Sequence, residues 1–155
     1  MSHPYQYAVL RFVQRVDRGE CLNVGVVVHS QSAGVLRCAF HLDEPRIVAF
    51  APDADLDGLR RALEAVRTMC EHPLADVGAA LSTPGKRFGW ITAPRSTVLQ
   101  PGPVHGGSVL DPAAEVDHLL ARLVTSSTGT DADRARGGQR RRRSSDRAQQ
   151  LLRGL

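Results

Sequence analysis

Cysteine is scarce in this chain of 155 residues, and its three cysteines lie far apart in the sequence. Their odd number, their wide spacing and the lack of a Cys-x-x-Cys pair argue against the disulfide framework that is typical of small secreted domains. No apolar run reaches the roughly 18 residues that a membrane-spanning helix requires. The first residues also lack the basic and apolar segments of a secretory signal. We therefore expect a cytoplasmic protein with no membrane segment, in which Cys21, Cys38 and Cys70 are small buried apolar residues.

The chain also lacks the short motifs that mark many catalytic and cofactor sites. It has no Gly-x-Ser-x-Gly nucleophile turn, and its "GKRFG" segment does not have the spacing of a phosphate-binding loop. Five of its histidines show no metal-ligand spacing: His29, His41, His72, His105 and His118. We therefore predict no metal site and no bound cofactor.

Lysine occurs only once, at Lys86, and most of the excess positive charge belongs to arginines near the C-terminus. The residues after Val124 include eight arginines and three aspartates, a net charge of +5, whereas the first 124 residues hold 12 basic and 13 acidic groups. Ser, Thr, Gly and charged residues dominate 125–155, which predicts a disordered, arginine-rich tail after a single domain over 1–124.

Four consecutive arginines at 140–143 are the densest part of this tail. Each arginine placed near a phosphate releases counterions, so the segment from Arg134 to Arg147 is a candidate contact for nucleic acid. No aromatic residue interleaves with the run, and a solvated tail is the alternative interpretation.

The N-terminal part of the sequence contains three β-forming segments, at 5–16, 22–30 and 35–42. Glycine-containing turns, "DRGE" and "QSAG", separate them, so the pattern predicts a three-stranded antiparallel meander with a more buried second strand. Gly25 lies inside that second strand, which indicates a bulge or a close approach of backbone.

Two segments then show helical periodicity. Leu56, Leu59, Leu63, Val66 and Cys70 fall on one helix face over 55–71, with Asp53 or Asp55 as the N-cap and Pro73 as the stop. A short helix within 74–81 is also expected.

The second periodic segment covers 111–124, where Asp111 is a favourable N-cap and Pro112 a favourable first residue. Between the two helices, "STVLQ" predicts a further strand that Pro101 and Pro103 end. The fold class is therefore α+β: an antiparallel sheet of about four strands packed against two main helices.

Five segments of the chain together resemble the bacterial domain-of-unknown-function family 3037: "YAVLRFV", "RGECLNVGVVV", "DADLDGL", "RFGWITAPRSTVLQPGPVH" and "DPAAEVDHLLARLV". The resemblance covers roughly residues 4–124, and Cys21 stands where the family pattern has an aromatic residue. It implies a bacterial cytoplasmic protein and a loose association with neighbours similar to kinases of the HipA toxin type. It implies no catalytic residues.

The segment from 87 to 105 carries the first candidate site, which we expect on a proline-stiffened loop. Arginine offers a planar set of donors for phosphate or carboxylate, and tryptophan can stack on a base. The candidate ligand-binding residues are Arg87, Trp90, Arg95, Thr97, Gln100 and His105. In the alternative, Trp90 fills the edge of the core, the arginines pair with carboxylates of the meander, and Gln100 serves the loop backbone.

A second candidate group consists of Glu20 and Asn23, with Arg11 on the preceding strand. These side chains would complete a polar site, although a Glu and an Asn beside a turn commonly serve the turn itself.

The sequence thus predicts a cytoplasmic binding or regulatory module with an anion site for phosphate or a nucleotide. A small enzyme acting on a phosphate-containing substrate, with His105 as acid or base, is one alternative. An obligate protein partner of a HipA-like kinase is another.

Overall fold

The computed structural model describes residues 1–72, 81–95 and 97–125. The meander is confirmed: β1 (His3–Phe12), β2 (Leu22–Ser30) and β3 (Val35–Phe40) pair antiparallel in sequence order. β2 is the most buried of the three strands, as its continuous run of valines predicts.

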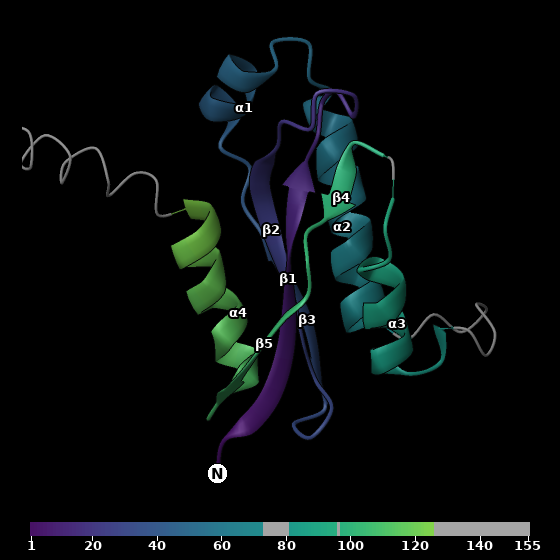
Figure 1. Ribbon diagram of the computed structural model, residues 1–155, viewed down its shortest axis with the longest axis vertical. Coiled ribbons are helices and arrows are strands. Elements are labelled where there is room, and N and C mark those ends of the chain that lie inside the picture. The colour runs from purple at the N-terminus through teal and green to yellow at the C-terminus, as the bar shows by residue number, and fades with distance from the viewer. Residues whose placement is uncertain (73–80, 96, 126–155) are drawn as a thin grey trace, which may run out of the picture. The chain divides into compact units, whose positions relative to one another are not determined.

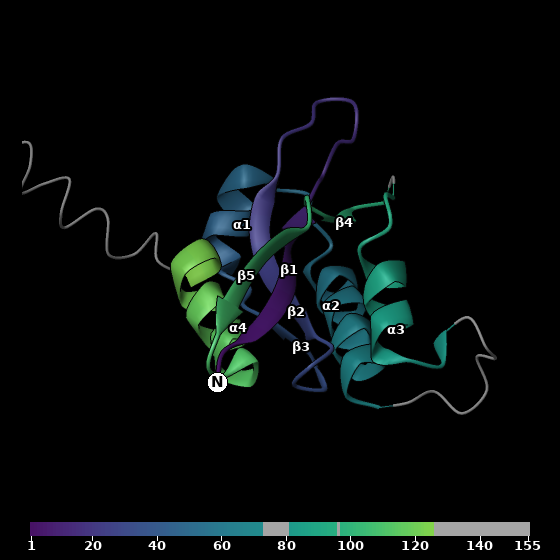
Figure 2. The same ribbon diagram turned by 60° about the horizontal axis from the view of Figure 1, so that its bottom comes forward.

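Two further strands occupy the other edge of β1 (Figure 2). β4 (Leu99–Pro101) pairs antiparallel with Leu10–Phe12, and β5 (His105–Val109) pairs antiparallel with His3–Tyr7. The "STVLQ" segment therefore does contribute a strand, although the strand includes Pro101 rather than ending before it. β5 was not predicted, because its "HGGSV" sequence has neither apolar alternation nor β-formers at its two glycines.

The structure shows both a bulge and a close approach of backbone at Gly25, the two alternatives that its position in the strand indicated. The register of β1 against β2 shifts between Leu10, which faces Gly25, and Arg11, which faces Asn23, so Val24 is the extra residue of a bulge. A Cβ at Gly25 would lie 3.1 Å from the Ala39 carbonyl oxygen on β3. The neighbouring strand thus comes too close for a larger residue.

α2 (Leu56–Glu71) confirms the first predicted helix, and the Asp55 carboxylate accepts a hydrogen bond of 3.0 Å from the Gly58 amide at its N-terminus. The second predicted helix begins as expected at α4 (Pro112–Leu120) after Asp111. It then continues as a π-helical turn, η2 (Ala121–Thr125), where an α-helix had been expected.

Two short helices were not predicted: α1 (Glu44–Phe50) and α3 (Pro84–Ile91). Each is too short to show a helical stripe, and each begins with a capping residue, Asp43 or Thr83, followed by a proline in its first turn. The interpretation of 87–105 as a loop was therefore wrong at its start, because Arg87–Ile91 belongs to α3.

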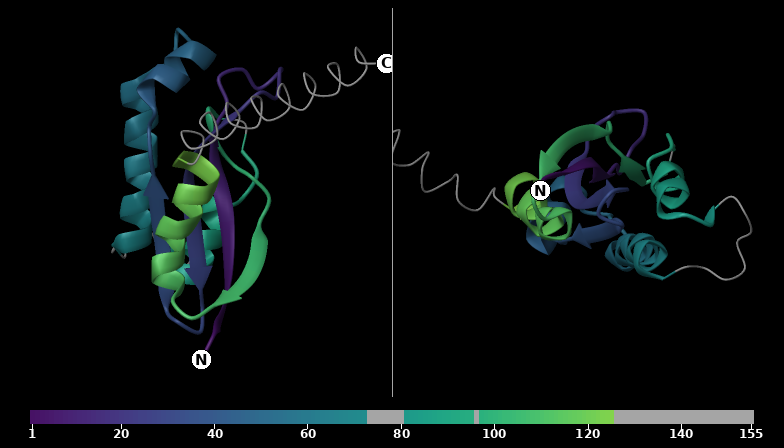
Figure 3. Two further views of the ribbon diagram at one scale, coloured as in Figure 1. Left: turned by 90° about the vertical axis from the view of Figure 1, so that its left-hand side faces the viewer. Right: turned by 90° about the horizontal axis from the view of Figure 1, so that it is seen from below.

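The sheet separates two hydrophobic cores. α2 and α3 lie on one side of the sheet and α4 on the other (Figures 1 and 3). Leu10, Phe12, Leu63 and Phe88 belong to the core on the α2 and α3 side, which α1 completes through Ile47. The core on the α4 side is smaller and contains Val26, Val28, Val116, Leu119 and Val124.

The short helix expected within 74–81 and the disordered tail expected over 125–155 fall outside the described residues, apart from Leu81 and Thr125. Of the helices in the described ranges, none combines the length and the apolar character needed to cross a membrane. Cys38 and Cys70 are buried, as expected, whereas Cys21 is exposed in the β1–β2 hairpin and corrects that part of the prediction.

Candidate functional site

Trp90 and Arg95 form a local pair at the end of α3. The Arg95 guanidinium lies 3.8 Å from the centre of the Trp90 ring, and its Nη2 donates a hydrogen bond of 2.6 Å to the Trp90 carbonyl oxygen. Trp90 is 45% exposed, so it does not fill the core edge, and the arginine does not pair with a carboxylate of the meander. The pair ties the segment after α3 back to the last turn of the helix.

Thr97 and Gln100 hydrogen-bond to backbone within their own segment. The Thr97 hydroxyl donates to the Leu99 carbonyl oxygen at 2.8 Å, and the Gln100 amide donates to the Thr97 carbonyl oxygen at 2.9 Å. This is the structural role that the alternative interpretation gave to Gln100.

His105 begins β5, where it pairs with Tyr7 of β1. The two rings are 5.3 Å apart between centres and inclined at 33°. The contact joins His105 to the β1 edge of the sheet, while Arg87, Trp90 and Arg95 belong to α3 and the turn after it. The contacts of the candidate residues therefore fall into separate groups along the chain.

Gln100, Arg11 and Asn23 occupy one row across β4, β1 and β2, because Arg11 is paired with each of the other two. Asn23 donates a hydrogen bond of 3.2 Å to the Leu123 carbonyl oxygen, which ties β2 to η2. The Arg11 guanidinium lies against Gly102, where a Cβ would come within 2.9 Å of its Cζ. Its buried Nε has no hydrogen-bond partner in the part of the chain that the structure describes.

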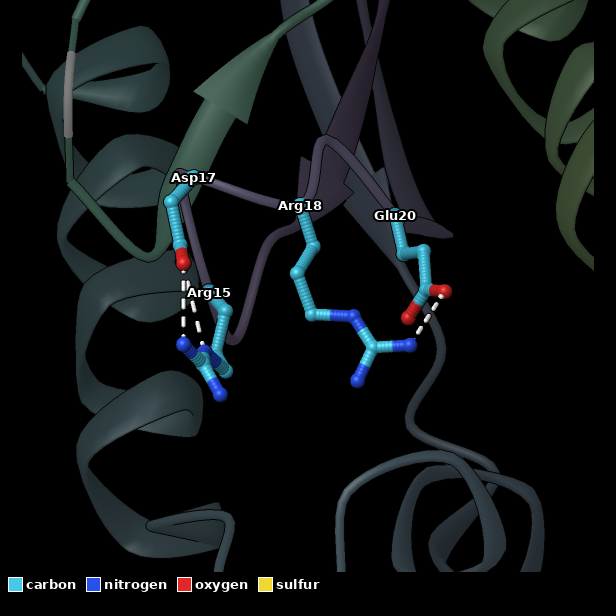
Figure 4. Close-up of polar contacts among 4 residues, drawn as sticks. All are labelled: Arg15, Asp17, Arg18 and Glu20. Atoms are coloured by element: carbon cyan, nitrogen blue, oxygen red, sulfur yellow. Dashed lines mark hydrogen bonds and ion pairs between the residues drawn. The ribbon is translucent and has the colours of Figure 1, made fainter.

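Glu20 serves the β1–β2 hairpin. Its carboxylate accepts a hydrogen bond of 2.9 Å from Arg18. Arg15 and Asp17 form a similar ion pair in the same hairpin (Figure 4). All four side chains are more than half exposed, so these pairs contribute little to stability. The structure thus brings Arg11 and Asn23 together but leaves Glu20 in the hairpin.

Arg87 differs from the other candidates because it is buried. The α3 backbone places it beside Phe88 on the inward side of the helix, and only 5% of its surface is exposed. Its Nη1 donates one long hydrogen bond, 3.4 Å, to the Leu81 carbonyl oxygen. In the described ranges its buried Nε has no hydrogen-bond partner, and no carboxylate pairs with the guanidinium.

A cavity of about 430 Å³ is lined in part by Arg87. It lies between β3, the end of α2 and the start of α3, and we call it the arginine cavity. Its other lining residues are Gly34, Val35, Leu36, Arg37, Cys70, Glu71 and Pro84. Sequence reasoning missed Arg37, because an outward-facing charged residue in an edge strand gives no signal that distinguishes it from ordinary surface charge.

The thiol in this cavity is not poised for nucleophilic chemistry. Burial raises the pKa of Cys70 to about 12, although the nearby Arg87 guanidinium opposes the shift. The thiolate is the reactive form of cysteine, and Cys70 lines the cavity as an uncharged, unreactive thiol near neutral pH. Among the residues that the structure describes, no group of three or more His, Cys, Asp or Glu side chains could hold a metal ion.

Comparison with known proteins agrees with the resemblance that the five sequence segments carry. A family described as "Protein of unknown function (DUF3037)" matches residues 7–124. No curated protein and no solved structure matches the chain.

Proposed function

The chain belongs to the DUF3037 family, and we propose that it is a cytoplasmic binding module that holds a phosphate-containing anion in the arginine cavity. The burial of Arg87 is the observation that carries this proposal. A guanidinium stays charged at all accessible pH values, and a buried charge is strongly unfavourable unless it is paired. An anion in the cavity would supply the charged partner that Arg87 lacks among the described residues.

Arg37 supplies the second cationic group. It lines the same cavity from the edge strand β3, and in the described ranges its exposed side chain forms no ion pair. Arg37 alternates with Leu36 and Cys38 of the larger core, so its side chain leaves the sheet on the α4 side and would have to turn around the edge of β3 to contact the anion. Two arginines that approach from different elements suit the several oxygens of a phosphate group better than a single cation does. Arg87 is the fixed donor, and Arg37 is free to adjust to the bound anion.

Glu71 also lines the cavity, and its negative charge opposes anion binding. It is exposed at the end of α2, where solvent weakens the repulsion more than it weakens contacts with the buried Arg87. The site is therefore tuned to moderate rather than maximal affinity for an anion.

Isothermal titration of the full chain with pyrophosphate, at constant ionic strength, tests the proposed function. Arg37→Ala should weaken binding about tenfold, because a hydrogen bond to a charged group contributes roughly 1.5 kcal/mol. Arg61→Ala is the matched control, since Arg61 is an exposed arginine of α2 outside the cavity and the change in net charge is the same. Glu71→Gln should strengthen binding by up to about fivefold.

Arg87→Lys tests the buried donor itself. The variant keeps the charge but loses the planar donor geometry, so pyrophosphate binding should fall well below that of the wild type. Equal affinities in the wild type, Arg37→Ala and Arg61→Ala, or no binding by any of them, would contradict the proposal. Loss of binding in Arg95→Ala alone would move the site to the Trp90–Arg95 pair.

A further inference from the structure

A second cavity adjoins the arginine cavity. Its volume is about 460 Å³, and the two cavities meet at shared lining residues, Gly34 and Pro84. Gly34 has a φ of 65°, a backbone conformation that favours glycine, so the tip of the β2–β3 hairpin carries no side chain between the two spaces. The other lining residues are His29, Ser30, Gln31, Thr83, Gly85 and Lys86.

His29 gives this second cavity a flat aromatic wall. Its ring stacks on the buried Phe88 ring, with centres 5.4 Å apart and planes inclined at 26°. A Cβ at Gly85 would lie 3.5 Å from Cε1 of His29, so glycine keeps side-chain atoms away from that edge of the ring. Burial lowers the pKa of His29, and the ring is therefore uncharged at neutral pH.

The two cavities thus differ in chemistry. The arginine cavity is lined by two arginines, Arg37 and Arg87, and the second cavity is lined by His29, whose neutral ring stacks on Phe88. Each volume falls within the range of about 300–1,000 Å³ that is typical of small-molecule sites. A ligand that fills both would need an anionic end and a flat, weakly polar end.

Resting on the anion site proposed above, we infer that the ligand is a nucleotide, with its phosphate against Arg37 and Arg87 and its base against His29. The sugar would then cross the junction at Gly34 and Pro84, where both lining residues are small or rigid. Stacking accepts any base, because every base has an aromatic face. The geometry points to the class of ligand and not to one base.

Titration of the full chain with ribose 5-phosphate and with the four nucleoside monophosphates, AMP, GMP, CMP and UMP, tests this inference. Ribose 5-phosphate supplies the phosphate and the sugar alone. At least one of the nucleotides should bind about tenfold more tightly than ribose 5-phosphate, the gain expected from stacking one base.

Three histidine variants locate that gain. His29→Ala should abolish the advantage of the nucleotide and leave the affinity for ribose 5-phosphate unchanged. His29→Phe should restore the advantage, because phenylalanine keeps a flat ring against Phe88. His105→Ala, which removes an exposed histidine on β5, is the matched control and should bind every probe like the wild type.

The outcomes separate this inference from the proposed function. If ribose 5-phosphate binds and no nucleotide binds more tightly, the anion site stands and the base site is wrong. If His29→Ala weakens ribose 5-phosphate and nucleotides equally while the fold is intact by thermal melting, His29 is structural and the base site is again wrong. If pyrophosphate, ribose 5-phosphate and the nucleotides all fail to bind, both proposals fall.

Discussion

Arg87 is the residue on which the proposed function depends. Among the described residues, this cation has 5% exposure and a single long hydrogen bond, an unfavourable position that an anion in the cavity would relieve. The sequence identified Arg87 as a candidate anion donor but not its burial, because no pattern of neighbouring residues distinguishes an inward-facing arginine from an exposed one. It could not identify Arg37 at all.

Gly25 allows a direct test of close packing at the level of one residue. Gly25→Ala should destabilise the protein by about 1–3 kcal/mol, since the new Cβ would lie 3.1 Å from both Ala39 O and Phe40 Cβ and the strands would have to shift. Chemical denaturation measures the change in the free energy of unfolding.

Gly89→Ala is the matched control for that substitution. Gly89 lies in α3 with nothing within 4 Å of a Cβ, so alanine should stabilise the helix by about 0.5–1 kcal/mol. A neutral or stabilising effect of Gly25→Ala would contradict the close approach of β3 to β2.

At the scale of elements, long periodic segments were predictable and short ones were not. The apolar stripes of α2 and α4 and the glycine-containing turns of the meander are local sequence patterns, and each is enough to predict its element. α1, α3 and β5 span only five to eight residues, and their stability comes from packing and strand pairing that the local sequence does not express. The candidate site was the feature predicted least well, because its central residue, Arg87, lies in the unpredicted helix α3.

Asp111 tests the capping of α4. Its carboxylate accepts hydrogen bonds from the Ala113 and Ala114 amides at 3.1 and 3.3 Å. Asp111→Ala should lower the free energy of unfolding by about 1 kcal/mol. Asp117→Ala removes the same charge from an exposed position on the same helix and should have a smaller effect; equal losses in a denaturation experiment would refute the cap.

At the scale of the molecule, the arginine cavity exists because three elements that are distant in sequence meet there. β3, the end of α2 and the start of α3 contribute Arg37, Cys70 and Arg87. No sequence motif joins these residues, so only the fold reveals the cavity. The α+β class and the meander were predictable, since each follows from local patterns that agree with one another.

Val124, the last buried residue of the smaller core, sets an end point for truncation. A chain that stops at Thr125 keeps every described element, and we predict that its melting temperature stays within about 3 °C of the full chain. Differential scanning calorimetry of the two chains makes the comparison. A substantially larger fall would show that residues 126–155 contribute to the stability of the fold.

The most direct test of the central claim is a nuclear magnetic resonance titration that observes the arginine Nε–H groups while pyrophosphate is added. The Arg87 signal, assigned by its loss in Arg87→Lys, should shift progressively and saturate, because the anion would supply the partner that the buried Nε lacks among the described residues. The Arg61 signal should not follow it. An Arg87 signal that stays in place at high pyrophosphate concentration would contradict an anion site in the arginine cavity.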